Sequence, residues 1–373
     1  MLKRFYDLNN YVRMGKVLLL YGAHQVGKTT LLNKYLASCG KKYKLDSGDN
    51  IRIQQVLASQ DFDQIKQYAQ GYDLIAIDEA QQIPFIGRAL KIIVDNIPGV
   101  IVIATGSSSF RLAREVGEPL TGRKRTIVLY PLSQIELKEY HNKFELKEHL
   151  EEYLIYGLYP EVLTSESRVE KRVILDELVN SYLLKDVLAL ERVKSSKVLL
   201  DLLKLLSFQI GNLVSLNELA TQLRIDIKTV ARYIDLLENA FVIVSVSGYS
   251  RNLRKEITSK NKYYFLDVGI RNAVISQFNE ISNRNDIGQL WENFIVVERL
   301  KKRIYQNIQG SSYFWRTYSG HEIDIVEEGS GKISAFECKW QDKKIRVPKE
   351  WSEKYPDASL EVISQDNYLD FIT

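Results

Sequence analysis

The most informative part of the sequence is Gly22-Ala23-His24-Gln25-Val26-Gly27-Lys28-Thr29, which fills every fixed position of the pattern G-x-x-x-x-G-K-[ST]. An apolar run, residues 17–21, precedes it, and a helical pattern begins near Thr30. In such a loop the glycines let the backbone wrap phosphates, and the amides at the next helix's N-terminus donate to them. Lys28 would reach the β and γ phosphates, and Thr29 would hold Mg²⁺. Residues 22–30 therefore predict a site for ATP and Mg²⁺.

A pair of acidic residues ends the apolar run Leu74-Ile75-Ala76-Ile77-Asp78-Glu79. Ligands of open α/β folds bind at the carboxyl edge of the sheet, where a strand of this kind ends. Behind a P-loop, we expect Asp78 to contribute to the Mg²⁺ shell and Glu79 to polarise the attacking water.

Hydroxyl side chains and arginines follow the third apolar run, residues 100–104. Ser107 and Thr105 are both candidates for sensing the γ-phosphate, and a plain turn is an equal alternative. Phosphoryl transfer also uses a mobile cation, commonly an arginine from a neighbouring subunit. Four arginines follow this segment, namely Arg111, Arg114, Arg123 and Arg125, of which we favour Arg123.

Length and composition limit the remaining options. At 373 residues the chain is long enough for two or three domains. Buried apolar runs alternating with helical patterns predict an α/β domain with a parallel sheet over residues 1–135. Two distant cysteines, no signal-peptide pattern and no apolar run of membrane-spanning length indicate a cytoplasmic protein without a membrane partner.

The middle region, residues 136–275, has mainly helical patterns. Residues 133–136 and 215–218 both have the form of a capping box. A short helix from Ser215, a turn at residues 224–226 and a helix over residues 227–240 predict a helix-turn-helix. Apolar runs at 242–246 and 262–266 complete a winged helix over about residues 205–268.

This winged helix is a candidate DNA-binding element. Its second helix exposes Lys228, Thr229 and Arg232. The stretch from Arg251 to Lys262 has five basic residues against the acid Glu256, namely Arg251, Arg254, Lys255, Lys260 and Lys262. Such modules also serve as lids or protein-docking units, and Asp235 on the exposed face would repel phosphate. DNA and a protein are therefore both retained as partners.

The third region, residues 276–373, contains a hairpin with candidate catalytic acids. Two alternating runs flank Gly329-Ser330-Gly331. The turn sets Asp324 opposite Phe336 or Glu337, and in the second case the two carboxylates lie about 5 Å apart on one face. Lys339 would share that face. Two acids and a lysine can hold Mg²⁺ and activate water for phosphodiester cleavage, although a surface ion pair is the simpler alternative. For a third acid, the apolar spacing of the helix over 286–303 favours Glu298 over Glu292.

In this order, the motifs resemble those of prokaryotic AAA-type ATPases that carry a C-terminal domain of unknown function related to PD-(D/E)xK restriction-endonuclease-like proteins. The resemblance also rests on Leu120-Thr121-Gly122-Arg123, Gly157-Leu158-Tyr159-Pro160, Phe265-Leu266-Asp267-Val268-Gly269 and Gly288-Gln289-Leu290-Trp291-Glu292. It implies a five-stranded parallel ATPase core, a helical and winged-helix middle, and a small nuclease-like α/β end. It also implies that Glu292 is the helix acid, and we follow it there. Relatives commonly carry Arg where this chain has His24.

Three functions follow from these features. The first is an ATP-driven enzyme that acts on DNA through a metal-dependent nuclease-like site at Glu292, Asp324, Glu337 and Lys339. The second is an ATPase switch that holds DNA or a protein through its winged helix and has a silent C-terminal fold. The third, a protein that binds ATP only structurally, is disfavoured because Lys28, Asp78 and Glu79 are all present. An arginine acting between subunits would require a homo-oligomer.

Overall fold

The computed structural model describes residues 2–107, 120–183, 196–250, 260–342 and 345–373. The chain forms two compact units. The first consists mainly of Met1–Pro131 and the second of Leu132–Leu184, Lys194–Glu238 and Val242–Thr373. The first border lies close to the expected 135, whereas the expected border at 275 falls inside the second unit.

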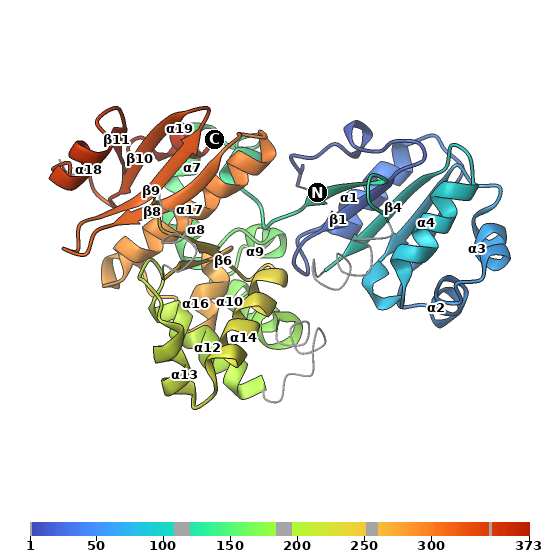
Figure 1. Cartoon of the computed structure of the whole chain (residues 1–373), viewed down its shortest axis with the longest axis horizontal. Coiled ribbons are helices and arrows are strands. Elements are labelled where there is room, and N and C mark those ends of the chain that lie inside the picture. The colour runs from blue at the N-terminus through green and yellow to red at the C-terminus, as the bar shows by residue number, and fades with distance from the viewer. Residues whose placement is uncertain (1, 108–119, 184–195, 251–259, 343–344) are drawn as a thin grey trace. The chain divides into compact units, whose positions relative to one another are not determined.

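The first unit is built on a parallel sheet, as its continuous apolar runs predict (Figure 1). Its strands, in the spatial order β2-β3-β4-β1-β5, are β1 (Val17–Tyr21), β2 (Tyr43–Ser47), β3 (Leu74–Asp78), β4 (Ile101–Gly106) and β5 (Lys124–Val128). All four neighbouring pairs are parallel. The carboxyl ends of β1, β3 and β4 therefore meet at one edge.

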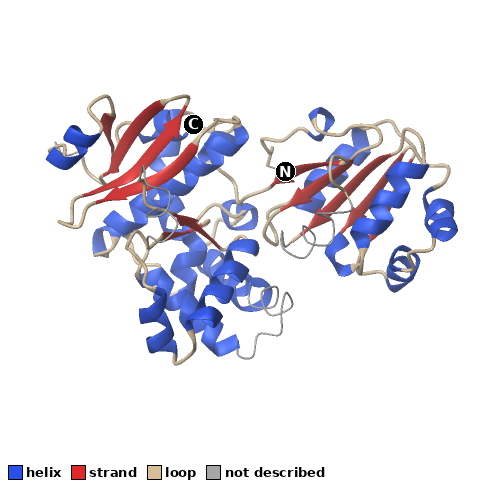
Figure 2. Ribbon diagram, viewed as in Figure 1, coloured by secondary structure: helices blue, strands red, loops and turns tan. Residues whose placement is uncertain are grey.

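Helices flank this sheet (Figure 2). They are α1 (Lys28–Ser38), α2 (Ile51–Ala58), α3 (Phe62–Ala69) and α4 (Ile86–Asn96). The inner face of α4, including Leu90 and Ile93, packs with Ile75 and Val102 of the sheet in one buried core. Burial of these side chains is the main force that holds the layers together.

The second unit begins with helices. They are α6 (Gln134–Leu137), α7 (Lys143–Glu148), α8 (Leu150–Tyr156), α9 (Pro160–Thr164), α10 (Arg168–Glu177), α12 (Ser196–Phe208), α13 (Leu216–Leu223), α14 (Ile227–Asn239) and α16 (Val268–Val274). Ser133 and Glu136 form the predicted capping box. The second prediction is wrong in part, since α13 starts after Ser215 but that side chain makes no capping hydrogen bond.

Two sheets complete the second unit. One pairs β6 (Ile243–Val246) with β7 (Lys262–Phe265). The other has the order β11-β10-β9-β8, with β8 (Ser311–Arg316), β9 (Glu322–Gly329), β10 (Lys332–Cys338) and β11 (Ser359–Ile363). Helices α17 (Ile287–Tyr305), α18 (Lys349–Lys354) and α19 (Tyr368–Ile372) accompany it. β10 and β11 are parallel, and the other pairs are antiparallel.

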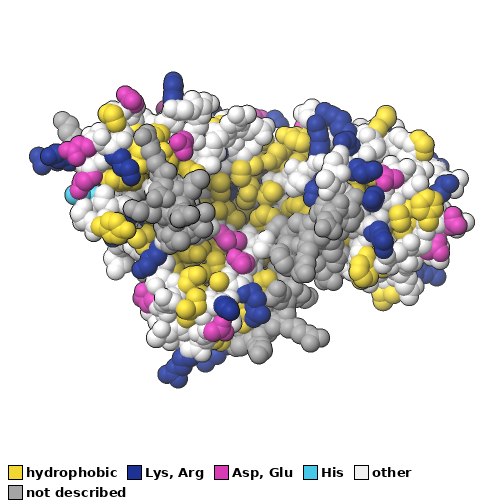
Figure 3. Space-filling view, in the orientation of Figure 1, with side chains coloured by type: hydrophobic (Ala, Val, Ile, Leu, Met, Phe, Trp, Pro, Cys, Tyr) yellow, Lys and Arg dark blue, Asp and Glu magenta, His cyan; other side chains and the backbone are white. Residues whose placement is uncertain are grey.

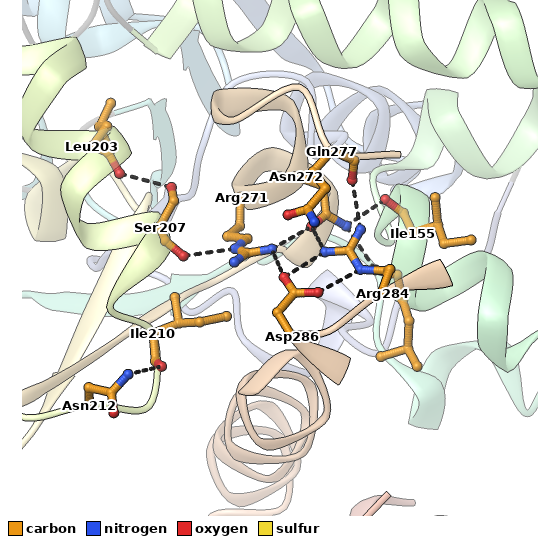
Figure 4. A network of polar contacts seen from close by, with 11 residues as sticks. Ile155, Leu203, Ser207, Ile210, Asn212, Arg271, Asn272, Gln277, Arg284 and Asp286 are labelled. Atoms are coloured by element: carbon orange, nitrogen blue, oxygen red, sulfur yellow. Dashed lines mark hydrogen bonds and ion pairs between the residues drawn. The ribbon is translucent and has the colours of Figure 1, made fainter. Parts of the chain in front are cut away.

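A network of charged and polar side chains connects α16 to α12 and α8 (Figure 4). Arg271 and Arg284 both donate to Asp286, at 2.6 Å and 2.8 Å. Arg271 also donates to the Ser207 carbonyl at the end of α12. Asn272 donates to the Ile155 carbonyl of α8. Because Arg271, Asn272 and Arg284 are buried and paired within this network, they fix the helices that lead into the C-terminal sheet.

Candidate functional site

The P-loop joins β1 directly to α1. Lys28, the first residue of the helix, is 4% exposed, and its Nζ donates to the carbonyls of Gly22 (3.0 Å) and Ala23 (2.9 Å). The backbone at Gly22 is so close to the segment after β5 that an added Cβ would lie 2.1 Å from the Leu129 carbonyl oxygen. Glycine is therefore required at residue 22, and the lysine ammonium lies within the loop that would wrap phosphates.

The predicted Mg²⁺ ligands lie close together, and a residue of the neighbouring strand contacts one of them. The Thr29 hydroxyl donates to Asp78 Oδ2 at 2.8 Å. The Thr105 hydroxyl, at the end of β4, donates to Asp78 Oδ1 and accepts the Glu79 amide at 3.0 Å. Thr29 and Asp78 are the groups that would hold the Mg²⁺ of bound MgATP, and their hydroxyl and carboxylate oxygens suit that ion.

Glu79 is held in an unusual backbone conformation. Its φ is +50°, in the left-handed region that residues other than glycine seldom adopt. Its carboxylate accepts from the side-chain amide of Gln81, which also donates to the Ser107 hydroxyl at 3.0 Å. Ser107 thus contacts the acid through Gln81, while Thr105 contacts both acids directly. The sequence argument left these two hydroxyls as alternatives and did not single out Gln81.

Arg4 is a further residue of this site that sequence reasoning missed. Its guanidinium donates to the Val26 carbonyl (2.5 Å) in the loop and to the Tyr130 carbonyl (2.6 Å) after β5. Arg4 is 126 positions from Tyr130 and belongs to no motif, so no local signal identifies it. Within the loop, Val26 is buried and His24 and Gln25 are half-buried, whereas Thr30 is exposed on α1.

Arg123 lies at the amino edge of the sheet, opposite the carboxyl edge that carries the P-loop. The Arg123 carbonyl accepts the amide of Val17, the first residue of β1. The P-loop begins at the other end of this strand, after Tyr21. The Arg123 side chain is 44% exposed and donates to Asp95 at 2.5 Å. With the length of β1 between them, about 16 Å at 3.3 Å per residue, Arg123 cannot reach phosphates in its own P-loop. Arg111 and Arg114 lie outside the described residues.

The predicted DNA-binding residues lie partly on α14. A turn with Arg224 in the left-handed conformation joins α13 to α14, and β6 and β7 follow. Lys228 and Arg232 are exposed on α14. Thr229 instead lies in the first turn of that helix, where its amide and hydroxyl donate to the capping carboxylate of Asp226 at 2.8 Å and 2.6 Å and lower the pKa of that acid.

Two further observations bear on DNA binding. The predicted loop residues Arg251, Arg254 and Lys255 lie outside the described residues. On the visible face, Lys and Arg side chains are interspersed with Asp and Glu side chains (Figure 3).

The C-terminal hairpin has the register that brings the acids together. Ser330 and Gly331, both with positive φ, form the turn, and Phe336 pairs with Ile325. Continuing this register by one residue sets Glu337 opposite Asp324. Asp324 Oδ2 accepts the Cys338 amide at 2.9 Å, and Glu337 accepts from Lys339 Nζ at 2.8 Å. Burial, reinforced by the charge of Asp324, raises the pKa of Glu337.

The two candidate helix acids have different surroundings. Glu298 is buried, as its spacing predicts, but it accepts from the Gln134 amide (2.6 Å) and from Lys301 (2.8 Å). It therefore anchors the start of α6. Glu292 interacts with Asp324, whose charge adds to the effect of burial and raises the pKa of Glu292 to about 8. The structure thus groups Glu292, as the family resemblance implies, with the hairpin acids.

Lys262 lies among these acids, although the sequence argument counted it with the basic loop. Its side chain is completely buried. Its Nζ lies 2.9 Å from Glu292 Oε1 and 3.7 Å from Asp324 Oδ1, and it also pairs with Glu322. Burial alone would lower the pKa of Lys262, but the three carboxylates raise it above its ordinary value. Across the residues that the structure describes, no three Asp, Glu, His or Cys side chains are arranged to hold a metal ion.

Comparison with known families divides the chain into three segments. Residues 14–138 match a family model described as an AAA domain. Residues 147–281 and 287–368 match two domains of unknown function, DUF8612 and DUF4143. The geometry of the loop and the two acids agrees with the first match. Residues 14–138 are therefore similar to AAA domains, and they contain the P-loop pattern of residues 22–29.

Similar full-length proteins carry no assigned function. An uncharacterized protein of Mycobacterium tuberculosis is 27% identical over 336 residues, which is 89% of this chain and 72% of that protein. An uncharacterized protein of Haemophilus influenzae is 27% identical over 341 residues, which is 85% of this chain and 80% of that protein.

Among solved structures, the replication initiator DnaA bound to AMPPCP and single-stranded DNA aligns with 60% of this chain and 82% of its own, at 18% identity and a TM-score of 0.26. At this score the alignment supports no inference. Among the described helices, none has the length and apolar character needed to cross a membrane.

Proposed function

We propose that this chain binds ATP with Mg²⁺ at the P-loop of residues 22–30 and hydrolyses it. The observation that carries the proposal is the convergence of Lys28, Thr29, Asp78 and Glu79 at the carboxyl ends of β1 and β3. When ATP binds, the Lys28 ammonium gives up its hydrogen bonds to the Gly22 and Ala23 carbonyls and donates to phosphate oxygens instead. Glu79, oriented by Thr105 and Gln81, polarises the attacking water.

ATP turnover by Lys28→Ala tests this proposal. The variant removes the ammonium that would balance phosphate charge, so we expect loss of ATP binding in calorimetry and loss of phosphate release. Lys34→Ala is the matched control, because Lys34 is exposed on the same helix. Binding by Lys28→Ala equal to that of wild type would refute the proposed site.

For the purpose of this turnover, we propose an ATPase switch that holds DNA or a protein partner through α13 and α14. Exposed Lys228 and Arg232 support a phosphate-bearing partner. The geometry gives less support to a metal-dependent nuclease. Asp324 and Glu337 are adjacent, as that function requires, but Lys339 is paired with Glu337 and Lys262 lies beside Asp324.

DNA cleavage distinguishes these two functions. Linear, nicked and branched DNA would be incubated with Mg²⁺ or Mn²⁺, with and without ATP, and with wild type or Glu337→Ala. The ATPase switch predicts no cleavage that depends on Glu337. Cleavage by wild type that disappears in Glu337→Ala would establish the nuclease instead.

A further inference from the structure

The acidic cluster of Glu292, Glu322 and Asp324 already contains a cation supplied by the chain itself. Lys262 extends from β7, a strand of the β6–β7 pair, whereas the acids belong to α17 and β9. The Lys262 amine therefore comes from the β6–β7 sheet, whereas Glu322 and Asp324 lie in the four-stranded C-terminal sheet. A fully buried ammonium needs acceptors on several sides, and the three carboxylates provide them.

We propose that the Lys262 ammonium is the permanent cation of this cluster and occupies the place that a divalent metal ion would need. Carboxylate oxygens hold Mg²⁺ or Ca²⁺ at about 2.0–2.6 Å. The amine lies between the Glu292 and Asp324 oxygens, at 2.9 Å and 3.7 Å, so a metal ion there would overlap it. Two positive charges in one buried space would also repel each other.

Other protein groups also lie against the oxygens of Glu292 and Asp324. Glu292 Oε1 also accepts the Tyr264 hydroxyl at 2.7 Å, and Asp324 Oδ2 accepts the Cys338 amide. The turn before α13 covers the other Glu292 oxygen, because a Cβ added to Gly211 would lie 2.8 Å from Oε2. Glu292 and Asp324 are thus oriented by protein groups without a metal ion.

Secondary structure holds the lysine in position. Lys262 pairs with Val246 in the β6–β7 ladder and bridges to Leu213. Its Nζ lies 5.5 Å from the centre of the Phe314 ring on β8. Withdrawal of the amine would leave buried carboxylates without a counter-charge. The cluster is a clamp between β7 and the C-terminal sheet, and this conclusion does not depend on ATP turnover.

Mn²⁺ binding to nucleotide-free protein tests the proposal. Every arm carries Asp78→Ala, which removes the P-loop acid as a competing ligand, and bound Mn²⁺ is counted by electron paramagnetic resonance. We expect no Mn²⁺ at the cluster when Lys262 is present. Lys262→Met, similar in length but uncharged, should have a lower Tm and should bind about one Mn²⁺ per chain, which restores the Tm. Lys262→Arg keeps the charge and should bind none.

Asp324→Asn assigns any bound ion to the cluster. Added to Lys262→Met, it should abolish the new site. The proposal is overturned if the chain with Lys262 binds Mn²⁺ and Asp324→Asn removes that binding. It is also overturned if Lys262→Met has an unchanged Tm, since the acids would then need no cation. Should Lys262→Met fail to fold, the measurement on the chain with Lys262 still decides.

Discussion

Thr105 couples the two acids of the ATP site through a single hydroxyl. It donates to Asp78 and accepts the backbone amide of Glu79, so one residue of the neighbouring strand holds the Asp78 carboxylate and the Glu79 backbone. Gln81 adds a second restraint on Glu79 and reaches Ser107. At this level the site consists of two acids whose orientations are set before any phosphate arrives, which lowers the cost of reaching the reactive geometry.

Glu79→Gln should separate binding from hydrolysis. The amide keeps an oxygen that can accept from Gln81, but it cannot act as a base. We expect ATP affinity near that of wild type and turnover lower by about 10²-fold or more. Phosphate release and nucleotide titration measure the two effects. Asp63→Asn, exposed on α3, is the control. Turnover by Glu79→Gln at the wild-type rate would mean that another group activates the water.

The P-loop is an element fastened at both ends. Gly22 packs against the Leu129 carbonyl, and Arg4 holds the Val26 carbonyl to the segment after β5. The loop therefore depends on the N-terminal segment as well as on β1 and α1. A loop restrained in this way loses less conformational entropy when it wraps phosphates.

Arg4→Met should loosen this element. Methionine replaces the apolar stem of Arg4 but removes its two charge-assisted hydrogen bonds to the Val26 and Tyr130 carbonyls. We expect a loss of about 2 kcal/mol in the free energy of unfolding and weaker ATP binding. Chemical denaturation and nucleotide titration measure both. Arg13→Met, whose exposed side chain donates to the adjacent Val12 carbonyl, should change neither. Equal stability of the two variants would contradict the role of Arg4.

For the whole molecule, the position of Arg123 limits how an arginine can take part in hydrolysis. It lies at the amino edge of the sheet, so a role at the phosphates requires a second copy of the chain. The chain itself passes between its two compact units after Pro131 and around Asn239–Phe241. The latter residues begin at Asn239, the last residue of α14, so this helix is covalently continuous with a segment assigned to the first unit.

Mixing two inactive variants tests whether Arg123 acts between subunits. Lys28→Ala keeps Arg123 but lacks a working P-loop, and Arg123→Ala has the reverse defect. If one chain completes the site of another, the mixture should regain ATPase activity that neither variant shows alone. Arg125→Ala, exposed two residues further on, should retain activity by itself. Full activity of Arg123→Ala alone, or an inactive mixture, would exclude this role.

Local patterns in the chain were enough to predict the parallel sheet, the P-loop, the acids after β3 and the C-terminal hairpin. Each depends on residues close in sequence, such as the apolar run of β1 or the Ser330–Gly331 turn that sets Glu337 opposite Asp324. Arg4 and Lys262 could not be assigned in this way. Their partners, Tyr130 for one and Glu322 for the other, are distant in sequence, and burial beside them is a property of packing. The same reason explains Glu298, since spacing correctly indicates that it is buried but only packing determines which groups it meets.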